Sequence, residues 1–319
     1  MAELTNYPDG LASFSFPVLP GGLPIGQDSK YYFIDPTFPA GGDGTLKSPF
    51  STLEAAYAKV RSGYWDGVFV IGTTTAVALA AAFTWSKNDS FLIGLCAPTL
   101  GQQRARITNG VSTNLFTPLV TISGSRVIVK NIQFFNGGNH ATSAAVCLQL
   151  TGERCYFENC QISGGGTVAS AGNAAMRSLV IAGGANQYGE HNFVHCQIGL
   201  DTILRNAVNY EIEITGHSPR NVFSGCLIDH NGVAGSFFLL VGAGGIDRYL
   251  LFNGCTFYNY TGNGGAALTN AYSINAAAGG DILMPRCMFV GATALPASAL
   301  VWADPEAAAN VILKALNPT

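Results

Sequence analysis

The stretch Phe193-Val194-His195-Cys196-Gln197-Ile198 decides the fold, because the pattern Phe-x-x-Cys-x-Ile returns along the chain in related forms. With the cysteine position as origin, and with an earlier copy in which isoleucine replaces cysteine included, the copies are 28, 36, 30, 29 and 32 residues apart. A repeat of about 30 residues indicates stacked units, each of which buries its apolar face on the next. The residues at this position are Ile132, Cys160, Cys196, Cys226, Cys255 and Cys287.

A second short apolar segment precedes each copy. In residues 119–124, apolar and polar side chains alternate until a glycine ends the run, which is typical of a strand followed by a turn. One unit is therefore predicted to contain a strand, a turn, a second strand and a loop of variable length. Similar segments occupy residues 147–152, 178–183, 211–216, 238–242 and 272–276.

The connections between these segments favour strands that pair in parallel from one coil to the next. No helical pattern separates the strands, which argues against alternating strands and helices, and no Asn-Gly-type two-residue turn joins them, which disfavours hairpins. We therefore predict an all-β protein, a single-stranded parallel β-helix in which equivalent residues of successive coils form ladders.

The repeat also predicts which way its side chains point. The cysteine position, the Phe three residues before it and the Ile or Phe two residues after it are expected to face the interior. An offset of three breaks the two-residue period of a strand, so we expect a bend between Phe and Cys. The position after the cysteine is expected to face outward, and it holds Gln133, Gln161, Gln197, Leu227, Thr256 and Met288.

The composition agrees with this fold and argues against two classes of binding partner. The chain of 319 residues has 39 glycines, and 48% of its residues are hydrophobic. Only 11% are charged, whereas charged residues usually make up about 25% of a chain. A net charge of −3 offers no basic surface, so no nucleic-acid partner is expected. The apolar run at residues 76–83 is too short to span a bilayer, so no membrane partner is expected either.

The cysteines are interpreted as core residues. Five of the eight share one ladder, as small buried apolar side chains would, and none has the spacing of a zinc site. The start Met1-Ala2-Glu3-Leu4 lacks the basic and apolar regions of a signal peptide, so we expect folding in a reducing cytosol. No metal and no cofactor are predicted.

Three regions are predicted. Residues 1–29, rich in proline and glycine, are expected to form an extended N-terminal arm that attaches to a partner through Phe14 and Phe16. Residues 30–290 are expected to form the β-helix. Ser51-Thr52-Leu53-Glu54 has the pattern of a capping box, with Ser51 as N-cap of a helix near residues 51–60 that covers the open end of the stack. Residues 291–319 are expected to form a C-terminal cap or tail.

The search for catalytic residues gives little. Glycoside hydrolysis needs two carboxyl groups about 5–9 Å apart, and the best candidates are Asp201 and Asp229, which follow two neighbouring copies of the repeat. They lie five and three residues after their cysteines, hence out of register. His230 follows Asp229, but adjacent residues of a strand point to opposite faces. We therefore predict no catalytic residues, and keep Asp201, Asp229 and His230 as the alternative.

The repeat and two N-terminal motifs resemble virion proteins of tailed bacteriophages that contain a right-handed β-helix of the tailspike and pectate-lyase-like kind. The motifs are Thr5-Asn6-Tyr7-Pro8-Asp9-Gly10, and Phe33-Ile34-Asp35-Pro36 followed by Gly42-Asp43-Gly44-Thr45-Leu46-Lys47-Ser48-Pro49-Phe50-Ser51-Thr52-Leu53. The resemblance implies a right-handed coil, a homotrimer and a place in the virion, and it carries over no catalytic residue.

Two functions follow as expectations. The first is a non-enzymatic capsid decoration protein, assembled in the bacterial cytoplasm, that binds the major capsid protein or other virion proteins and stabilises the head shell. The alternative is a tail fibre or tailspike-type protein that binds a receptor or depolymerises a glycan, which requires a groove with aromatic residues and paired carboxylates.

Overall fold

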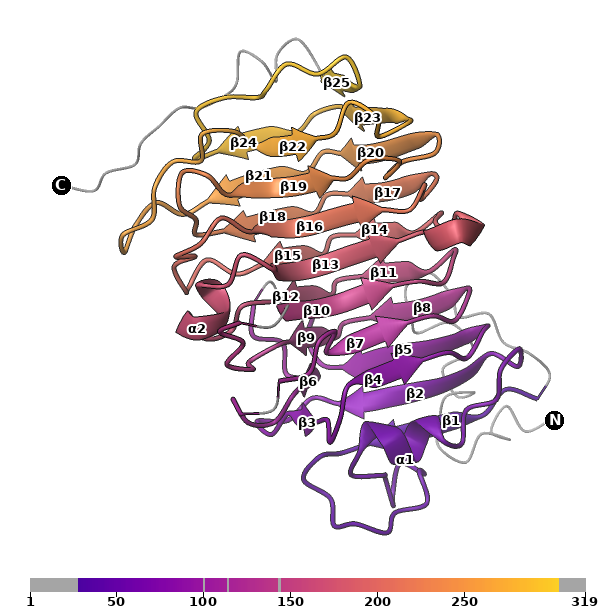
Figure 1. Cartoon of the computed structure of the whole chain (residues 1–319). Helices are drawn as coiled ribbons and strands as arrows, with labels where there is room; N and C mark the ends of the chain where they lie inside the picture. Colours follow the sequence, from indigo (N-terminus) through magenta and orange to yellow (C-terminus); the bar gives the residue numbers. More distant parts are fainter. Residues whose placement is uncertain (1–27, 100, 114, 143–144, 304–319) are drawn as a thin grey trace.

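The computed structural model shows a chain wound into stacked coils, each stacked directly on the one before it (Figure 1). It describes residues 28–99, 101–113, 115–142 and 145–303. In these residues the strands form three sheets of ten, eight and seven strands, and neighbouring strands within each sheet pair in parallel. The predicted all-β parallel β-helix is confirmed. The arm residues Phe14 and Phe16 lie outside the described residues.

The ten-stranded sheet begins and ends the stack. Its strands are β1 (Tyr31–Ile34), β2 (Asp66–Ile71), β5 (Ser90–Leu95), β8 (Val127–Lys130), β11 (Tyr156–Glu158), β14 (Asn192–Val194), β17 (Asn221–Ser224), β20 (Tyr249–Asn253), β23 (Asp281–Met284) and β25 (Val301–Ala303).

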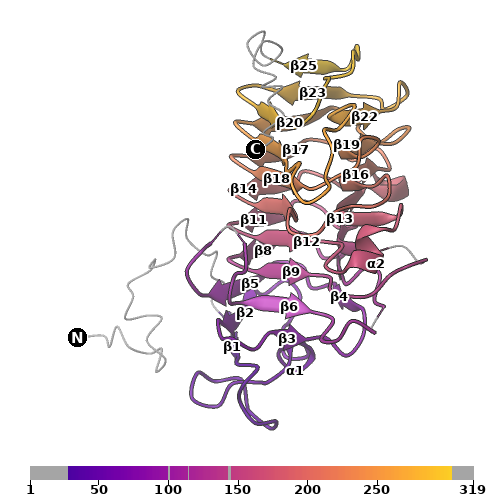
Figure 2. The ribbon, with the colours of Figure 1, turned by 90° about the vertical axis from the view of Figure 1, so that its left-hand side faces the viewer.

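The other two sheets complete each coil (Figure 2). The eight-stranded sheet contains β3 (Val77–Ala78), β6 (Arg106–Thr108), β9 (Gln133–Phe135), β12 (Gln161–Ser163), β15 (Gln197–Gly199), β18 (Leu227–His230), β21 (Thr256–Asn259) and β24 (Met288–Val290). The seven-stranded sheet contains β4 (Phe83–Trp85), β7 (Val120–Ile122), β10 (Ala145–Leu150), β13 (Met176–Ala182), β16 (Tyr210–Thr215), β19 (Phe237–Val241) and β22 (Tyr272–Ile274).

The repeat spans the bend between the ten-stranded and the eight-stranded sheet. Its Phe lies in a strand of the first sheet, and the residue after its Cys begins a strand of the second. The residue between the strands, just before Cys, has a positive φ in every copy, for example 50° at His195 and 60° at Gly225. This left-handed residue turns the chain and accounts for the break in the two-residue period.

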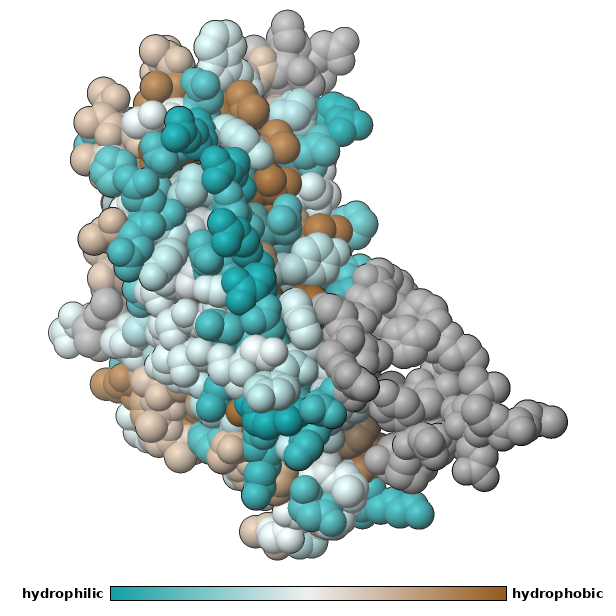
Figure 3. Space-filling view, turned by 90° about the vertical axis from the view of Figure 1, so that its right-hand side faces the viewer, coloured by the Kyte–Doolittle hydropathy of each residue, from teal (hydrophilic) through white to brown (hydrophobic). Residues whose placement is uncertain are grey.

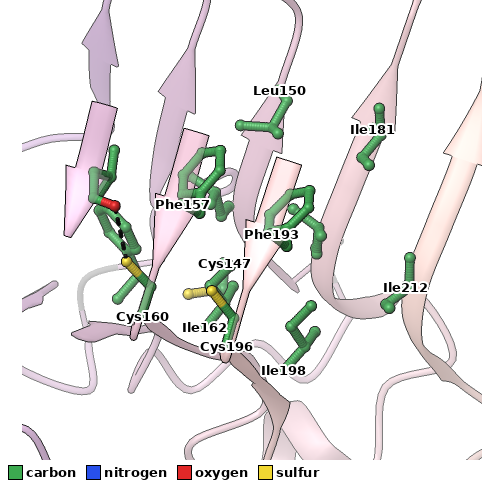
Figure 4. Close-up of a cluster of buried hydrophobic side chains, with 14 of the residues drawn as sticks. Cys147, Leu150, Phe157, Cys160, Ile162, Ile181, Phe193, Cys196, Ile198 and Ile212 are labelled. Atoms are coloured by element: carbon green, nitrogen blue, oxygen red, sulfur yellow. Dashed lines mark hydrogen bonds between the residues drawn. The ribbon is translucent and has the colours of Figure 1, made fainter. Parts of the chain in front are cut away.

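The interior is a stack of equivalent side chains. The rings of Phe157, Phe193, Phe223 and Phe252 are stacked with centroids 4.8, 4.5 and 4.7 Å apart, and all six residues at the cysteine position are buried. Figure 4 shows Phe157 and Phe193 beside Cys160 and Cys196 in this core. All eight cysteines are free thiols, and burial raises the pKa of the Cys196 thiol, which keeps it protonated.

Helices are short. The helix α1 (Leu53–Tyr57) lies at the β1 end of the stack and buries Leu53 and Ala56 (Figure 1). Its N-cap is Thr52, whose hydroxyl accepts from the Ala55 amide, so the predicted cap at Ser51 is wrong by one residue and the helix is shorter than predicted. The Glu54 carboxylate accepts from the Ala80 amide instead of closing a capping box. The loops contain α2 (Val168–Ala171) and the single turn η1 (Gly184–Asn186).

Strand pairing continues past the predicted limit at residue 290. Strand β25 pairs with β23, with Val301 opposite Ile282. The ten-stranded sheet therefore extends into the region that was predicted to be a cap or tail.

Replacing Phe193 by alanine should destabilise the protein by about 3–5 kcal/mol, because it removes the ring between two stacked neighbours and leaves a cavity. Val194→Ala, on the next residue of the same strand but only half-buried, should cost about 1 kcal/mol or less. Urea unfolding followed by circular dichroism measures both. Equal losses would contradict the buried stack as the source of stability.

Candidate functional site

A row of polar side chains runs across the outer face of the eight-stranded sheet. Strand pairing places Gln133, Gln161 and Gln197 side by side, with Arg106 before them and Leu227 after them. These residues point outward as predicted, yet Gln161 and Gln197 are only 2% and 7% exposed. The Arg106 Nε donates to the Gln133 Oε1 at 2.6 Å. The Oε1 atoms of Gln161 and Gln197 are buried and have no hydrogen-bond partner among the described residues.

Asp229 lies beside these amides, in a second row of outward-facing positions on the same sheet. Asp229 pairs with Gly199 on the neighbouring strand, and its Oδ2 accepts from the Gln197 Nε2 at 2.8 Å. Position 199 requires glycine, since its φ is 112° and a Cβ there would lie 1.8 Å from the Asp229 carbonyl oxygen. The Oδ1 of Asp229 is buried without a hydrogen-bond partner in the described chain.

The first row forms the floor of a pocket, which we call the glutamine pocket. It has a volume of about 360 Å³ and is lined by Arg106, Gln133, Phe135, Gln161, Gln197 and Asp201, with further residues from segments 101–102 and 200–203. The aromatic ring of Phe135 and the carboxylate of Asp201 thus share one hollow with the amides. Asp229 lies next to this hollow, behind Gln197, and is 2% exposed.

The pKa of the Asp229 carboxyl is raised. Burial raises the pKa of Asp229 from 3.8 to about 7, the negative charge of Asp201 raises it further in the same direction, and the hydrogen bond from Gln197 opposes the shift. The carboxyl of Asp229 therefore keeps its proton up to about neutral pH. Asp201 lies close enough to Asp229 for its charge to act on that carboxyl, although the two residues are out of register in the repeat.

The loop that carries Asp201 is fixed by hydrogen bonds. The Leu200 amide donates to the Asp229 carbonyl at 3.1 Å. The Asn231 side chain donates to the Asp201 carbonyl at 3.0 Å, and the Arg205 amide donates to the Asn231 carbonyl at 2.7 Å. These bonds fold the loop back over β18, which places Asp201 near Asp229.

A buried charge network supports the loop from behind. The Glu211 Oε1 accepts from Arg205 Nη2 at 3.0 Å and lies 2.7 Å from His230 Nδ1, while Ser178 donates to Oε2. Glu211, Arg205 and His230 are fully buried. Burial alone would raise the pKa of Glu211, but the charge of Arg205 and the bonds from His230 and Ser178 hold it below its ordinary value.

His230 therefore does not belong to the pocket. Burial lowers its pKa, and its ring contacts Glu211, whereas Asp229 contacts Gln197 in the outer row. The two residues point to opposite faces, as expected for neighbours in a strand. Sequence reasoning missed Glu211 and Arg205. No spacing distinguishes Glu211 from Glu213, which pairs with Arg177 at 2.6 Å in a half-exposed position.

The side of the stack opposite the eight-stranded sheet is marked by ion pairs. There, ion pairs connect successive coils, among them Arg126 with Asp89 at 2.6 Å and Arg154 with Glu190 at 2.5 Å. Figure 3 shows a band of hydrophilic side chains along this side. These pairs are exposed, so each contributes little to stability.

The described residues hold no cluster of metal ligands and no membrane-spanning helix. They contain no group of three or more His, Cys, Asp or Glu side chains that would hold a metal ion. Of their helices, none has the length and apolarity needed to cross a membrane.

Comparison with known proteins shows the fold. No family model and no curated protein matches the chain. A pectate lyase structure matches with a TM-score of 0.56 and 15% identity over 82% of this chain, which spans 64% of that enzyme. A rhamnogalacturonan lyase matches with a TM-score of 0.56 and 13% identity over 83% of this chain and 69% of its own. The pectin methylesterase from Aspergillus niger matches with a TM-score of 0.50 and 16% identity, over 89% and 83%.

These likenesses show a right-handed parallel β-helix. They correct the prediction that the chain is not an enzyme, because the structures that share its fold are a pectate lyase, a rhamnogalacturonan lyase and a pectin methylesterase. They lend no support to a phage virion origin. The homotrimer, the capsid partner and the location in a virion stay predictions.

The proton on Asp229 should make stability depend on pH. Because the pKa is raised from 3.8 to about 7, the stabilising contribution is complete below about pH 4 and is lost as the pH rises through 7. We expect the free energy of unfolding to fall between about pH 4 and pH 8 by about 3 kcal/mol more in the wild type than in Asp229→Asn. Urea unfolding at a series of pH values measures this difference.

The control is Asp247→Asn at a surface turn, which should behave like the wild type. Parallel curves for the wild type and Asp229→Asn would show that Asp229 titrates normally.

Proposed function

We propose that this protein is an enzyme that hydrolyses an acidic polysaccharide, with the glutamine pocket as the sugar-binding site. The observation that carries the proposal is the carboxyl pair: Asp201 lines the pocket, and Asp229, buried behind Gln197, keeps a proton near neutral pH. Glycoside hydrolysis requires two such groups in different protonation states.

The pocket has groups that suit a sugar. The unpartnered Oε1 atoms of Gln161 and Gln197 accept hydrogen bonds from hydroxyl groups, which removes the cost of leaving them buried and unsatisfied. The Phe135 ring offers an apolar surface for a sugar face. The guanidinium of Arg106 adds a positive charge to the same floor, which favours a sugar that carries a carboxylate.

The reaction follows from these positions. Asp229 lies behind Gln197, so the Gln197 side chain moves aside for the reaction. Asp229 then gives its proton to the glycosidic oxygen as the bond from that oxygen to the anomeric carbon breaks. A water molecule attacks the anomeric carbon and transfers a proton to Asp201, so a new carbon–oxygen bond replaces the broken one. Burial and repulsion from Asp201 raise the pKa of Asp229 and so favour the protonated form that this step needs, against the opposing hydrogen bond from Gln197.

The comparisons support the substrate class. The proteins that share the fold are named for pectate, rhamnogalacturonan and pectin. We therefore take polymers of these kinds as the first substrates to test.

The purified protein should release new reducing ends from polygalacturonate or rhamnogalacturonan. Asp229→Asn and Asp201→Asn should each lower kcat about 10²–10⁴-fold, because each removes one proton transfer. Asp247→Asn, a carboxyl far along the chain from the pocket residues, should retain wild-type activity. Measurements of reducing ends and of polymer chain length show whether the wild type and each variant cleave the polymer.

Three outcomes would contradict this assignment. The wild type could leave both polymers intact, or Asp229→Asn could cleave as fast as the wild type. Unsaturated ends in the products would indicate elimination instead of hydrolysis.

A further inference from the structure

A second hollow lies on the bend between the ten-stranded and the eight-stranded sheet. It has a volume of about 260 Å³, and its lining includes Thr99, Gln103, Asn159, His195 and Leu227. We call it the corner hollow. Asn159 and His195 are the left-handed residues that turn two successive coils. The hollow is therefore a product of the same repeat that builds the stack.

The corner hollow adjoins the glutamine pocket. Leu227 in its lining pairs with Gln197, the residue of the neighbouring strand that lines the glutamine pocket. Residues 101 and 102 line the glutamine pocket, while Thr99 and Gln103 of the same chain segment line the corner hollow. Described residues of one chain segment therefore line both hollows.

Gln103 supplies an unused acceptor in the corner hollow. Its side chain is 2% exposed, and its Nε2 donates to the Thr99 carbonyl at 3.0 Å and to the Asn159 carbonyl. These bonds fix the amide, so its Oε1 cannot turn to find another donor. The Oε1 is buried and has no hydrogen-bond partner in the described part of the chain. Such an atom is costly unless a ligand donates to it.

The remaining lining suits a sugar ring. The Leu227 side chain gives an apolar floor where the three preceding coils carry glutamine. His195 is exposed at the rim, and position 225 beside it is glycine, where a Cβ would lie 2.7 Å from the imidazole Cδ2. None of the described residues that line the hollow is Asp, Glu, Lys or Arg. Its chemistry therefore fits hydroxyl groups and a ring face, without a charge partner.

We propose that the corner hollow is a second sugar-binding subsite, which holds another ring of the same polysaccharide that occupies the glutamine pocket. Gln103 accepts from a ring hydroxyl, and Leu227 packs against the ring. This inference rests on the proposed function, and it predicts that affinity increases with chain length once a ligand spans both hollows.

The test measures binding without turnover. Oligogalacturonates from the disaccharide to the hexasaccharide are titrated calorimetrically into the Asp229→Asn variant. We expect Kd to decrease about tenfold at the length that reaches the corner hollow. A second substitution, Leu227→Trp, fills the hollow and should abolish that gain while the affinity for the shortest bound oligomer stays unchanged.

His195→Ala in the same background serves as a second variant, because its side chain is exposed and its loss should leave the fold intact. It should reduce the gain with length about threefold or more. The proposal is overturned if neither variant changes the length dependence, or if no oligomer binds. Failure of the proposed function has a different signature: the wild type would not cleave the polymer, whatever the pattern of binding.

Discussion

The in-register parallel pairing of successive coils is the constraint on which the rest of the structure depends. Each residue pairs with its equivalent in the next coil. Side chains of the same type therefore lie above one another along the axis. Inside, this repetition stacks Phe193 between two other phenylalanine rings and aligns the buried thiols. Outside, it aligns side-chain amides that are too close to the surrounding loops to be solvated. The same rule therefore produces both the core and the floor of the site.

The site arises where the repetition is broken. Gly199 has no side chain, so the backbone of β18 can approach it closely. Asp229 then lies beside Gln197. The loop after β15 then returns over β18 and brings a second carboxylate with it. The buried pair of Arg205 and Glu211 holds that loop. A regular ladder would have given a surface of equivalent amides, whereas these departures give a protonated carboxyl next to an ionisable one.

Much of the fold was predictable from the sequence, and little of the site. The pattern around Cys196 gave the coil length, the bend and the outward glutamines, because each depends only on spacing. The N-cap is Thr52 and not Ser51 because either hydroxyl can cap a helix, and the Glu54 carboxylate that indicated Ser51 accepts from the Ala80 amide instead. Asp201 and Asp229 were noticed, but their proximity depends on the path of a loop set by Asn231 and Arg205. The burial of Gln103 and Glu211 likewise comes from tertiary contacts that no spacing reveals.

The proposed chemistry depends most directly on the protonation of Asp229. Its carboxyl carbon can be followed by nuclear magnetic resonance as the pH is varied, with Asp229→Asn to assign the signal. A midpoint near 7 is the predicted result, since burial and the neighbouring Asp201 both disfavour the charged form. A midpoint near the ordinary value of 3.8 would contradict it, because Asp229 would then carry no proton to donate at neutral pH.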